Sequence, residues 1–352
     1  MSAAVLFGSF FVLLLLTVPI GYAIGISSLI AIYYFSDIPL IIIAQKSITG
    51  VDSFPLLAIP FFMLAGNLMS SGGIARRLVN FFDALIGHVT GGLGMVTIIV
   101  CMFFAAISGS AVATVSAVGA FMIPEMVDHG YNKPFSAALT AAAGTIGVII
   151  PPSIPFVIYG VVSGTSITDM FTAGFMPGIM MGAALMIVCY FVSKKNGYRG
   201  KEKASSAKEV WVAFKDAFWA ILSPVIILGG IYSGFFTPTE AAVISVVYSF
   251  IVGVFVYKEL DVRGAYKSFK DAIVVNGATT FMVGFSTVFA AFLTMAQIPN
   301  MIAQAILGLT DNAILILLII NIFLLIVGMF IDNIPATIIL TPILLPICTG
   351  VG

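Results

Sequence analysis

Long apolar runs separated by short polar stretches set the pattern of this sequence. The first run extends from about Ala3 to Thr17, and a second follows Pro19 to about Phe35. A helix needs about 20 apolar residues to cross a bilayer, whereas a membrane barrel strand would alternate apolar and polar positions. The runs approach that length and do not alternate, so the pattern predicts an all-α polytopic membrane protein.

Two shorter segments depart from this pattern. Residues 37–50, DIPLIIIAQKSITG, are too few and too polar to span, and they predict a partial or tilted helix. From Gly73 to His88, apolar residues fall on one helical face while Arg76 and Arg77 fall elsewhere. This periodicity predicts an amphipathic helix that lies along the membrane interface.

Small polar residues crowd the segment from Ser108 to Thr114, within the run FFAAISGSAVAT. Such a segment is either a tightly packed helix or the tip of a hairpin that enters and leaves on one side. The polar exit EMVDHGYNKP favours a re-entrant hairpin at about residues 105–128.

The stretch from Thr140 to Gly160 is apolar but rich in helix breakers, including Pro151 and Pro152. Adjacent prolines lack N–H groups and clash with the preceding turn, so we expect a broken helix within about residues 135–165. Irregular backbone at membrane depth must be enclosed by protein or line a cavity, which makes the stretch a candidate site. The alternative is an ordinary proline kink.

The amino-acid composition agrees with a membrane protein. Of the 352 residues 61% are hydrophobic and 9% are charged, against about 25% charged residues in a soluble domain. The formal charge is zero and no basic face suggests nucleic acid as a partner. Neither HExxH, GxSxG nor a Walker loop occurs, so we expect no enzyme.

Charge is concentrated in one segment, residues 193–216, which holds seven of the 15 basic residues. Loops rich in Lys and Arg face the cytoplasm, so this segment is predicted to be a cytoplasmic linker. A helix from about Phe171 to Val192 leads into it. The linker separates a first repeat, residues 1–192, from a second, residues 217–352.

The second repeat weakly echoes the first. Aligning Pro124 with Pro346 gives an offset of 222 residues, and the short helix at Gln297–Leu307 then corresponds to the one at Gly73–His88. Inverted repeats of this kind are typical of secondary transporters. The offset maps Gly130 onto Gly352, so the sequence stops where the second broken helix would begin. Either the second repeat lacks this helix or the natural chain continues, and we favour the second.

An unwound helix offers carbonyl oxygens beside Ser and Thr hydroxyls, and such oxygens bind Na⁺. The predicted sodium site therefore combines the hairpin tip with the broken helix: Ser108, Gly109, Ser110, Gly144, Thr145, Gly147, Ile150 and Pro151. Thr114 and Ser153 are predicted to face the substrate. The alternative is that each hydroxyl bonds only within its own helix.

A charged residue at membrane depth is a functional hypothesis by default. Asp332 is the best candidate, and with Gly328, Asn333 and Thr337 it predicts a second ion site or a substrate contact. Glu240 lies near the end of a segment and could equally sit in the interface.

Six motifs together resemble one known family. They are GVDSFPLLAIPFFMLAGNLM, FFAAISGSAVAT, AAAGTIGVIIPPSIPFVIYG, FTAGFMPG, FTPTEAA and FIDNIPATIILTPILLPI. In this order they resemble the large membrane subunit, the M or DctM-type permease, of tripartite ATP-independent periplasmic (TRAP) transporters. Relatives carry sialic acid or C4-dicarboxylates, and no residue decides between these solutes.

The resemblance implies an elevator-type, sodium-coupled importer of a carboxylate-bearing organic acid in the bacterial inner membrane. Its expected partners are a small membrane subunit on a separate chain and a periplasmic substrate-binding protein. The scaffold would contain the first two helices and the Pro238 helix. The mobile transport domain would carry the broken helix and two hairpins, the second at about Gly328 to Pro346.

Two alternatives stay open at this point. Coupling to protons in place of sodium would keep the fold, and a channel or a scaffold subunit without active transport would also place a glycine-rich broken helix in the membrane.

Overall fold

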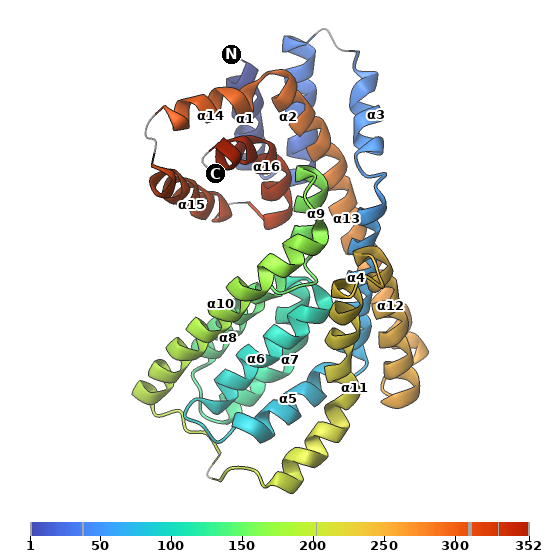
Figure 1. Ribbon diagram of the computed structural model, residues 1–352, viewed down its shortest axis with the longest axis vertical. Coiled ribbons are helices and arrows are strands. Elements are labelled where there is room, and N and C mark those ends of the chain that lie inside the picture. The colour runs from blue at the N-terminus through green and yellow to red at the C-terminus, as the bar shows by residue number, and fades with distance from the viewer. Residues whose placement is uncertain (1, 37–38, 202, 309–311, 330, 351–352) are drawn as a thin grey trace. The chain divides into compact units, whose positions relative to one another are not determined.

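The computed structural model describes the chain except for residues 1, 37–38, 202, 309–311, 330 and 351–352 (Figure 1). Within the described residues every regular element is a helix. Seven of the described helical segments are long and apolar enough to cross a membrane: Phe54–Ser71, Ala111–Asp128, Ile167–Asn196, Ala207–Tyr232, Pro238–Val256, Val262–Met295 and Asn333–Gly350. These findings confirm the predicted all-α, multi-pass membrane protein.

The chain divides into two compact units. The first comprises Met1–Leu56, Ile158–Thr165 and Val274–Gly352, and the second comprises Leu57–Val157 and Ser166–Ile273. Both units take residues from either side of the basic segment at 193–216. The repeats predicted at residues 1–192 and 217–352 were inferred from similarity within the sequence. The division into compact units does not test them, so they stay predictions.

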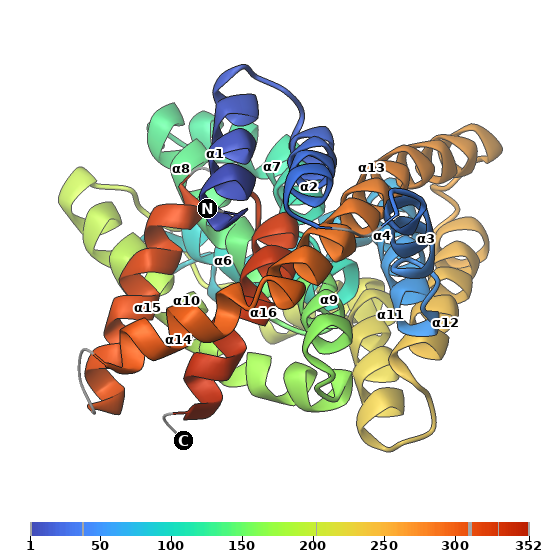
Figure 2. The same cartoon turned by 90° about the horizontal axis from the view of Figure 1, so that it is seen from above.

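The first unit begins with α1 (Ser2–Leu15) and α2 (Ile20–Phe35), which match the two predicted apolar runs. These helices lie side by side in both ribbon views (Figure 2). A Cβ atom on Gly25 of α2 would lie 2.7 Å from the Phe285 ring of α13 (Val262–Met295), so a larger residue would separate the two helices. The short α3 (Ile41–Thr49) confirms the predicted partial helix.

Three further helices complete the first unit: α14 (Ile298–Leu307), α15 (Ala313–Gly328) and α16 (Asn333–Gly350). α14 is the short helix expected at Gln297–Leu307, and it packs against α16. Pro342 and Pro346 both lie within α16, so the turn between α15 and α16 falls at the beginning of the segment assigned to the second hairpin.

The second unit contains the segments to which the candidate sodium residues belong. Its elements, some of which end in the other unit, are η1 (Phe54–Leu57), α4 (Ala58–Ser71), α5 (Ile74–Ile86), α6 (Gly92–Ser108), α7 (Ala111–Asp128), α8 (Lys133–Gly144), η2 (Thr145–Val148), α9 (Ile154–Ser163), α10 (Ile167–Asn196), α11 (Ala207–Tyr232), α12 (Pro238–Ile251) and η3 (Val252–Val256). α10 covers the helix predicted at Phe171–Val192 and extends it at both ends.

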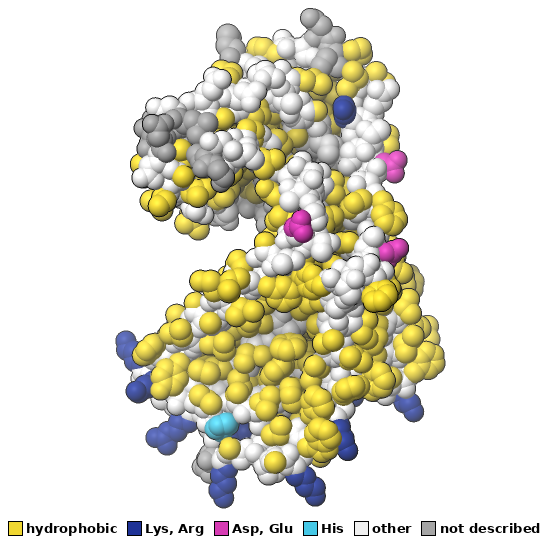
Figure 3. Space-filling model, in the orientation of Figure 1, with side chains coloured by type: hydrophobic (Ala, Val, Ile, Leu, Met, Phe, Trp, Pro, Cys, Tyr) yellow, Lys and Arg dark blue, Asp and Glu magenta, His cyan; other side chains and the backbone are white. Residues whose placement is uncertain are grey.

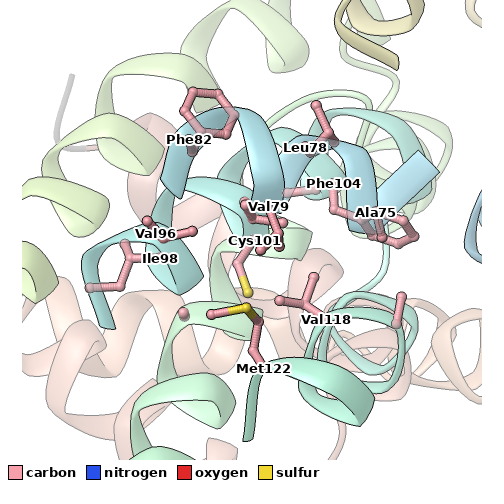
Figure 4. Packing of buried hydrophobic residues seen from close by; sticks show 14 of the residues in the cluster. Ala75, Leu78, Val79, Phe82, Val96, Ile98, Cys101, Phe104, Val118 and Met122 are labelled. Atoms are coloured by element: carbon pink, nitrogen blue, oxygen red, sulfur yellow. The ribbon is translucent and has the colours of Figure 1, made fainter. Parts of the chain in front are cut away.

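The apolar face of α5 packs on protein. Helices α6 and α11 cover this face. Figure 4 shows the cluster that results: Ala75, Leu78, Val79 and Phe82 of α5 with Val96, Ile98, Cys101 and Phe104 of α6 and Val118 and Met122 of α7. The amphipathic helix was predicted correctly, and its position along the membrane interface stays a prediction. Periodicity shows that a face is apolar without showing what covers it.

Two helices begin with a capping box, in which a hydroxyl and a carboxylate each accept from the other residue's backbone N–H. At the start of α11 these residues are Ser206 and Glu209. At the start of α12 the Glu240 carboxylate accepts from the Thr237 N–H at 2.8 Å and from its hydroxyl at 2.9 Å. Glu240 therefore caps a helix end.

Candidate functional site

The hairpin tip lies between α6 and α7. Helix α6 ends at Ser108 and α7 begins at Ala111, so the chain makes a turn at Gly109 and Ser110 in place of one continuous helix. Gly109 has φ +62°, a conformation that side-chain-bearing residues rarely adopt. A Cβ atom at this position would also lie 2.7 Å from the Pro152 carbonyl oxygen. Glycine is therefore required here for two independent reasons.

Three oxygen atoms converge beneath this turn. The hydroxyls of Ser108 and Thr114 are 3.1 Å apart, and both side chains are fully buried. Thr114 donates to the Ser110 carbonyl at 2.8 Å, and the Ser108 hydroxyl lies 3.4 Å from the same carbonyl. The Ser110 hydroxyl points elsewhere and caps α7 by accepting from the Ala113 N–H.

The backbone between α8 and α9 is irregular. α8 ends at Gly144, a tight 3₁₀ turn covers Thr145–Val148, and no regular helix follows until Ile154. Ser153 bridges this gap, because its hydroxyl donates to the Val148 carbonyl at 2.6 Å and accepts from the Phe156 N–H at 3.3 Å. This buried hydroxyl replaces part of the backbone hydrogen bonding that Pro151 and Pro152 cannot provide.

The hairpin tip and the irregular backbone are in direct contact. The Ile154 N–H donates to the Gly109 carbonyl at 3.2 Å. A Cβ atom on Gly147 would lie 2.8 Å from the Thr114 hydroxyl and 2.9 Å from the Ser110 carbonyl oxygen. The main chain of the hairpin tip thus lies directly against the main chain of the irregular stretch.

The predicted residues differ in how they take part. Ile150 and Pro151 are buried within the irregular stretch. Gly144 lies against Val115 and the Ala111 carbonyl of α7. Thr145 is exposed, and its hydroxyl donates to the Ala142 carbonyl at 2.7 Å within its own helix. The Thr145 hydroxyl therefore bonds to a neighbouring turn of the backbone. This agrees with the alternative that each hydroxyl bonds only locally.

The second predicted group lies in the first unit, where α15 ends at Gly328 and α16 begins. Asp332 is exposed, and its carboxylate accepts from the Asn333 N–H at 2.8 Å. The Thr337 hydroxyl donates to the Asn333 carbonyl at 2.7 Å. These contacts are local ones that stabilise the first turn of α16.

The atoms available as ligands for an ion are hydroxyl and carbonyl oxygens. Oxygen donors of this kind suit hard cations, whereas transition metals prefer imidazole and thiolate. In the part of the chain that the structure describes, His, Cys, Asp and Glu do not gather in groups of three that could hold a metal ion. The chemistry that the hairpin tip can support is therefore binding of a hard cation by backbone and hydroxyl oxygens.

Sequence reasoning missed the role of Arg77 on α5. Its side chain is only 13% exposed, with Nη1 2.8 Å from the Glu259 carboxylate and Nε 3.2 Å from that of Asp216. The guanidinium lies 3.8 Å from the centre of the Tyr257 ring. Consecutive arginines on the polar face of an amphipathic helix were the available signal, but their partners are far away in the sequence.

The hydroxyl group of Tyr257 both donates and accepts a hydrogen bond. The hydroxyl donates to the Asp216 carbonyl at 2.9 Å and accepts from the Ala220 N–H at 3.1 Å. Burial raises the pKa of Tyr257 to about 12, against the opposing effect of the Ala220 hydrogen bond and the Arg77 charge. The phenol is therefore neutral at physiological pH and can act as a donor.

Comparison with known proteins gives a consistent result. Residues 7–352 match a family described as "Tripartite ATP-independent periplasmic transporter, DctM component". The isethionate TRAP transporter permease protein DctMQ of Oleidesulfovibrio alaskensis is 47% identical over 348 residues, which cover 99% of this chain and 55% of that protein.

Two other relatives are similar over almost the whole chain. The sialic acid TRAP transporter large permease protein SiaM of Vibrio cholerae is 41% identical over 97% of this chain and 79% of its own length. The C4-dicarboxylate TRAP transporter large permease protein DctM of Rhodobacter capsulatus is 36% identical over 100% of this chain and 83% of its own. The chain thus spans between about half and four fifths of these relatives. It belongs to the DctM component family of tripartite ATP-independent periplasmic transporters.

Proposed function

We propose that this chain acts as the large permease subunit of a tripartite transporter that imports an organic acid into a bacterium, driven by sodium. Family membership supports this role, and so do relatives named for isethionate, sialic acid and C4-dicarboxylates. These solutes are all small organic anions, although isethionate carries a sulfonate where the others carry carboxylates. The proposed substrate class is therefore an organic acid of either kind.

The observation that carries the sodium part of this proposal is the contact between the hairpin tip and the irregular backbone. Sodium would bind main-chain oxygens of Ser108, Gly109 and Ser110 together with oxygens from the stretch between Gly144 and Pro151. The Ser110 carbonyl already accepts a hydrogen bond from Thr114 at 2.8 Å. It also accepts from the Thr114 N–H at 3.1 Å, so Thr114 fixes this carbonyl through two hydrogen bonds, and a bound cation would have to share the oxygen with them.

Coupling follows from this arrangement. A sodium ion shared by both segments would hold the tip against the irregular backbone, and bound sodium would thereby favour one arrangement of the Gly109 turn. Ser153 and Thr114 are proposed to lie on the side of this junction that faces the organic acid, and their hydroxyls would have to leave the Val148 and Ser110 carbonyls to donate to it. Substrate affinity and sodium affinity rise together in such a system, because each ligand stabilises the conformation that the other requires.

The residues at the start of α16 are proposed to supply a second ion site or a substrate contact. Asp332 offers a carboxylate, and Gly328, Asn333 and Thr337 lie close to it in the sequence. The transport step itself is proposed to follow an elevator mechanism, with the hairpins and the broken helix moving relative to a scaffold that includes α1, α2 and α12.

The proposed partners are a small membrane subunit on a separate chain and a periplasmic binding protein that delivers the solute. The proposed location is the bacterial inner membrane. These assignments rest on the family, since tripartite transporters are assembled from such components.

The test is uptake of radiolabelled sialic acid, a C4-dicarboxylate or isethionate into proteoliposomes that contain all three components. Accumulation against a concentration gradient that needs an inward sodium gradient would support the proposal. Accumulation that follows a proton gradient and ignores sodium would overturn the sodium assignment. Conductance without the binding protein would overturn the transporter assignment in favour of a channel.

A further inference from the structure

The basic segment between α10 and α11 is fixed to the second unit at several points. The Tyr198 ring stacks on Tyr131 with 4.4 Å between ring centroids. The Tyr198 carbonyl accepts from the Gly91 N–H at 3.1 Å, and its hydroxyl accepts from the Asn132 N–H at 3.1 Å. Residues 197–201 are therefore not a free tether.

Lys201 closes this attachment. Its N–H donates to the Gly87 carbonyl at 2.9 Å, and its ammonium group forms an ion pair with Asp83 at the end of α5. Lys201 is thus neutralised within the protein, and the backbone on either side of Arg199 is held in place.

The other cations of this segment have no such partner. Lys194, Lys195, Arg199, Lys203 and Lys208 are exposed, and none forms an ion pair or a hydrogen bond through its side chain with any described residue. Residues 193–216 contain seven basic and three acidic residues, so a strong positive excess remains. Figure 3 shows Lys and Arg side chains gathered along the lower rim of the second unit, where Figure 1 places the end of α10 and the start of α11.

The helix dipoles favour the positions of only some of these cations. Lys194 and Lys195 lie in the last turn of α10, where a cation is favourable. Lys208 lies in the first turn of α11, where the helix dipole disfavours a positive charge. An external anion beside Lys208 would remove that unfavourable interaction.

Aromatic rings lie directly beyond the cations on α11. Trp211 stacks on Phe214, Phe214 contacts Phe218 edge to face, and Phe218 contacts Trp219 in the same way. Trp211 and Trp219, the two tryptophans of the sequence, are 55% and 41% exposed. Lys215 lies over the Trp211 ring, 5.4 Å from its centre. Exposed Trp residues mark the boundary between lipid headgroups and hydrocarbon in membrane proteins.

We propose that the last turn of α10, residues 197–201 and the first turns of α11 form a binding surface for anionic phospholipid headgroups. The unpaired cations would contact the phosphate groups, and the α11 rings would lie at the depth of the glycerol backbone. Basic clusters next to a membrane span attract anionic lipids. The fixed backbone around Arg199 means that little ordering is needed when a headgroup binds. This assignment does not depend on the proposed transport activity.

The test compares the lipid shell of the intact protein in nanodiscs made from phosphatidylcholine and phosphatidylglycerol. The variant Lys194→Gln/Lys195→Gln/Arg199→Gln removes three unpaired cations. The matched control Arg263→Gln/Lys267→Gln/Lys270→Gln removes three exposed cations near the start of α13, where residues 258–271 contain four basic and three acidic residues. Native mass spectrometry of lipids that remain bound gives the ratio of the two phospholipids for each protein.

The expected result is enrichment of phosphatidylglycerol on the unmodified protein, reduced about tenfold in the first variant and little changed in the control. Added salt should also reduce the enrichment, because headgroup attraction is screened. Absence of enrichment on the unmodified protein, or an equal loss in both variants, would overturn the proposal. Lys203→Gln/Lys208→Gln provides a second, independent pair of removed charges if the first variant does not fold.

Discussion

The Ile154 N–H donates to the Gly109 carbonyl at 3.2 Å, and this bond joins the start of α9 to the turn between α6 and α7. It connects two segments that are each irregular because of their own glycines and prolines. Around it, the Gly109, Gly147 and Ser153 positions leave no room for larger side chains or bind backbone atoms directly. The predictions below follow from this junction and from the ion-pair network at Arg77.

Replacing Gly109 with alanine should impair sodium binding and uptake. The substitution forces a Cβ atom to within 2.7 Å of the Pro152 carbonyl oxygen, in addition to the cost of about 1–2 kcal/mol for a left-handed backbone. Gly130→Ala is the matched control, since Gly130 has φ +84° and nothing within 4 Å of the added atom. Sodium-dependent uptake should fall strongly only for Gly109→Ala. Equal losses in both variants would show that backbone strain alone is responsible.

The Thr114 hydroxyl should matter for sodium affinity while the Thr145 hydroxyl should not. Thr114→Val removes one of the two hydrogen bonds from Thr114 to the Ser110 carbonyl, and loss of one buried hydrogen bond costs about 0.5–1.5 kcal/mol. The sodium concentration for half-maximal uptake should therefore rise by about two- to tenfold. Thr145→Val removes a hydroxyl bonded only to Ala142 and should leave this concentration unchanged. A larger effect at Thr145 would mean that its side chain moves to the ion.

Arg77 should contribute more to stability than its neighbour Arg76. Arg77→Gln leaves two carboxylates without a partly buried partner and should lower the free energy of unfolding by about 1–3 kcal/mol. The Arg76 side chain is 67% exposed and, among the described residues, pairs with Glu259 alone, so Arg76→Gln should cost about 0–1 kcal/mol. Denaturant unfolding in detergent measures both values. Similar losses would contradict the assigned role of Arg77.

Tyr257 should make the protein less stable at alkaline pH. Burial raises the pKa of its phenol from 10.0 to about 12, so the folded state holds this proton more tightly than the unfolded state does. The stabilisation that results is fully present below pH 10 and is lost as the pH rises through about 12. The unfolding midpoint should fall over this range more steeply for the unmodified protein than for Tyr257→Phe. Parallel curves would show that Tyr257 is not responsible.

The sequence was sufficient where local backbone chemistry decides the structure. Apolar run length predicted α1, α2 and most of α10, and the Pro151–Pro152 pair predicted loss of helix. The polar segment EMVDHGYNKP favoured a hairpin over a continuous helix around Gly109. In each case the physical cause, hydrophobic length, missing N–H groups or backbone freedom, resides within a few residues.

Features that depend on distant neighbours were not predictable in this way. The periodicity of α5 predicted an apolar face but did not reveal that α6 and α11 cover it. Arg77 was not singled out, because its partner Asp216 is 139 residues away. The Thr145 hydroxyl was placed with the ion ligands, although a rotation about one side-chain bond decides between the site and the local Ala142 carbonyl.

The most direct test of the proposed sodium site measures the thermal unfolding midpoint of the purified protein at increasing sodium concentrations. A ligand that binds only the folded state raises this midpoint with its concentration. At equal ionic strength, the midpoint should be higher in sodium than in potassium. Gly147→Ala should remove most of this rise. Gly229→Ala should retain it, because a Cβ atom on Gly229 has nothing within 4 Å. Equal midpoints in sodium and potassium for the unmodified protein would contradict the proposed sodium site.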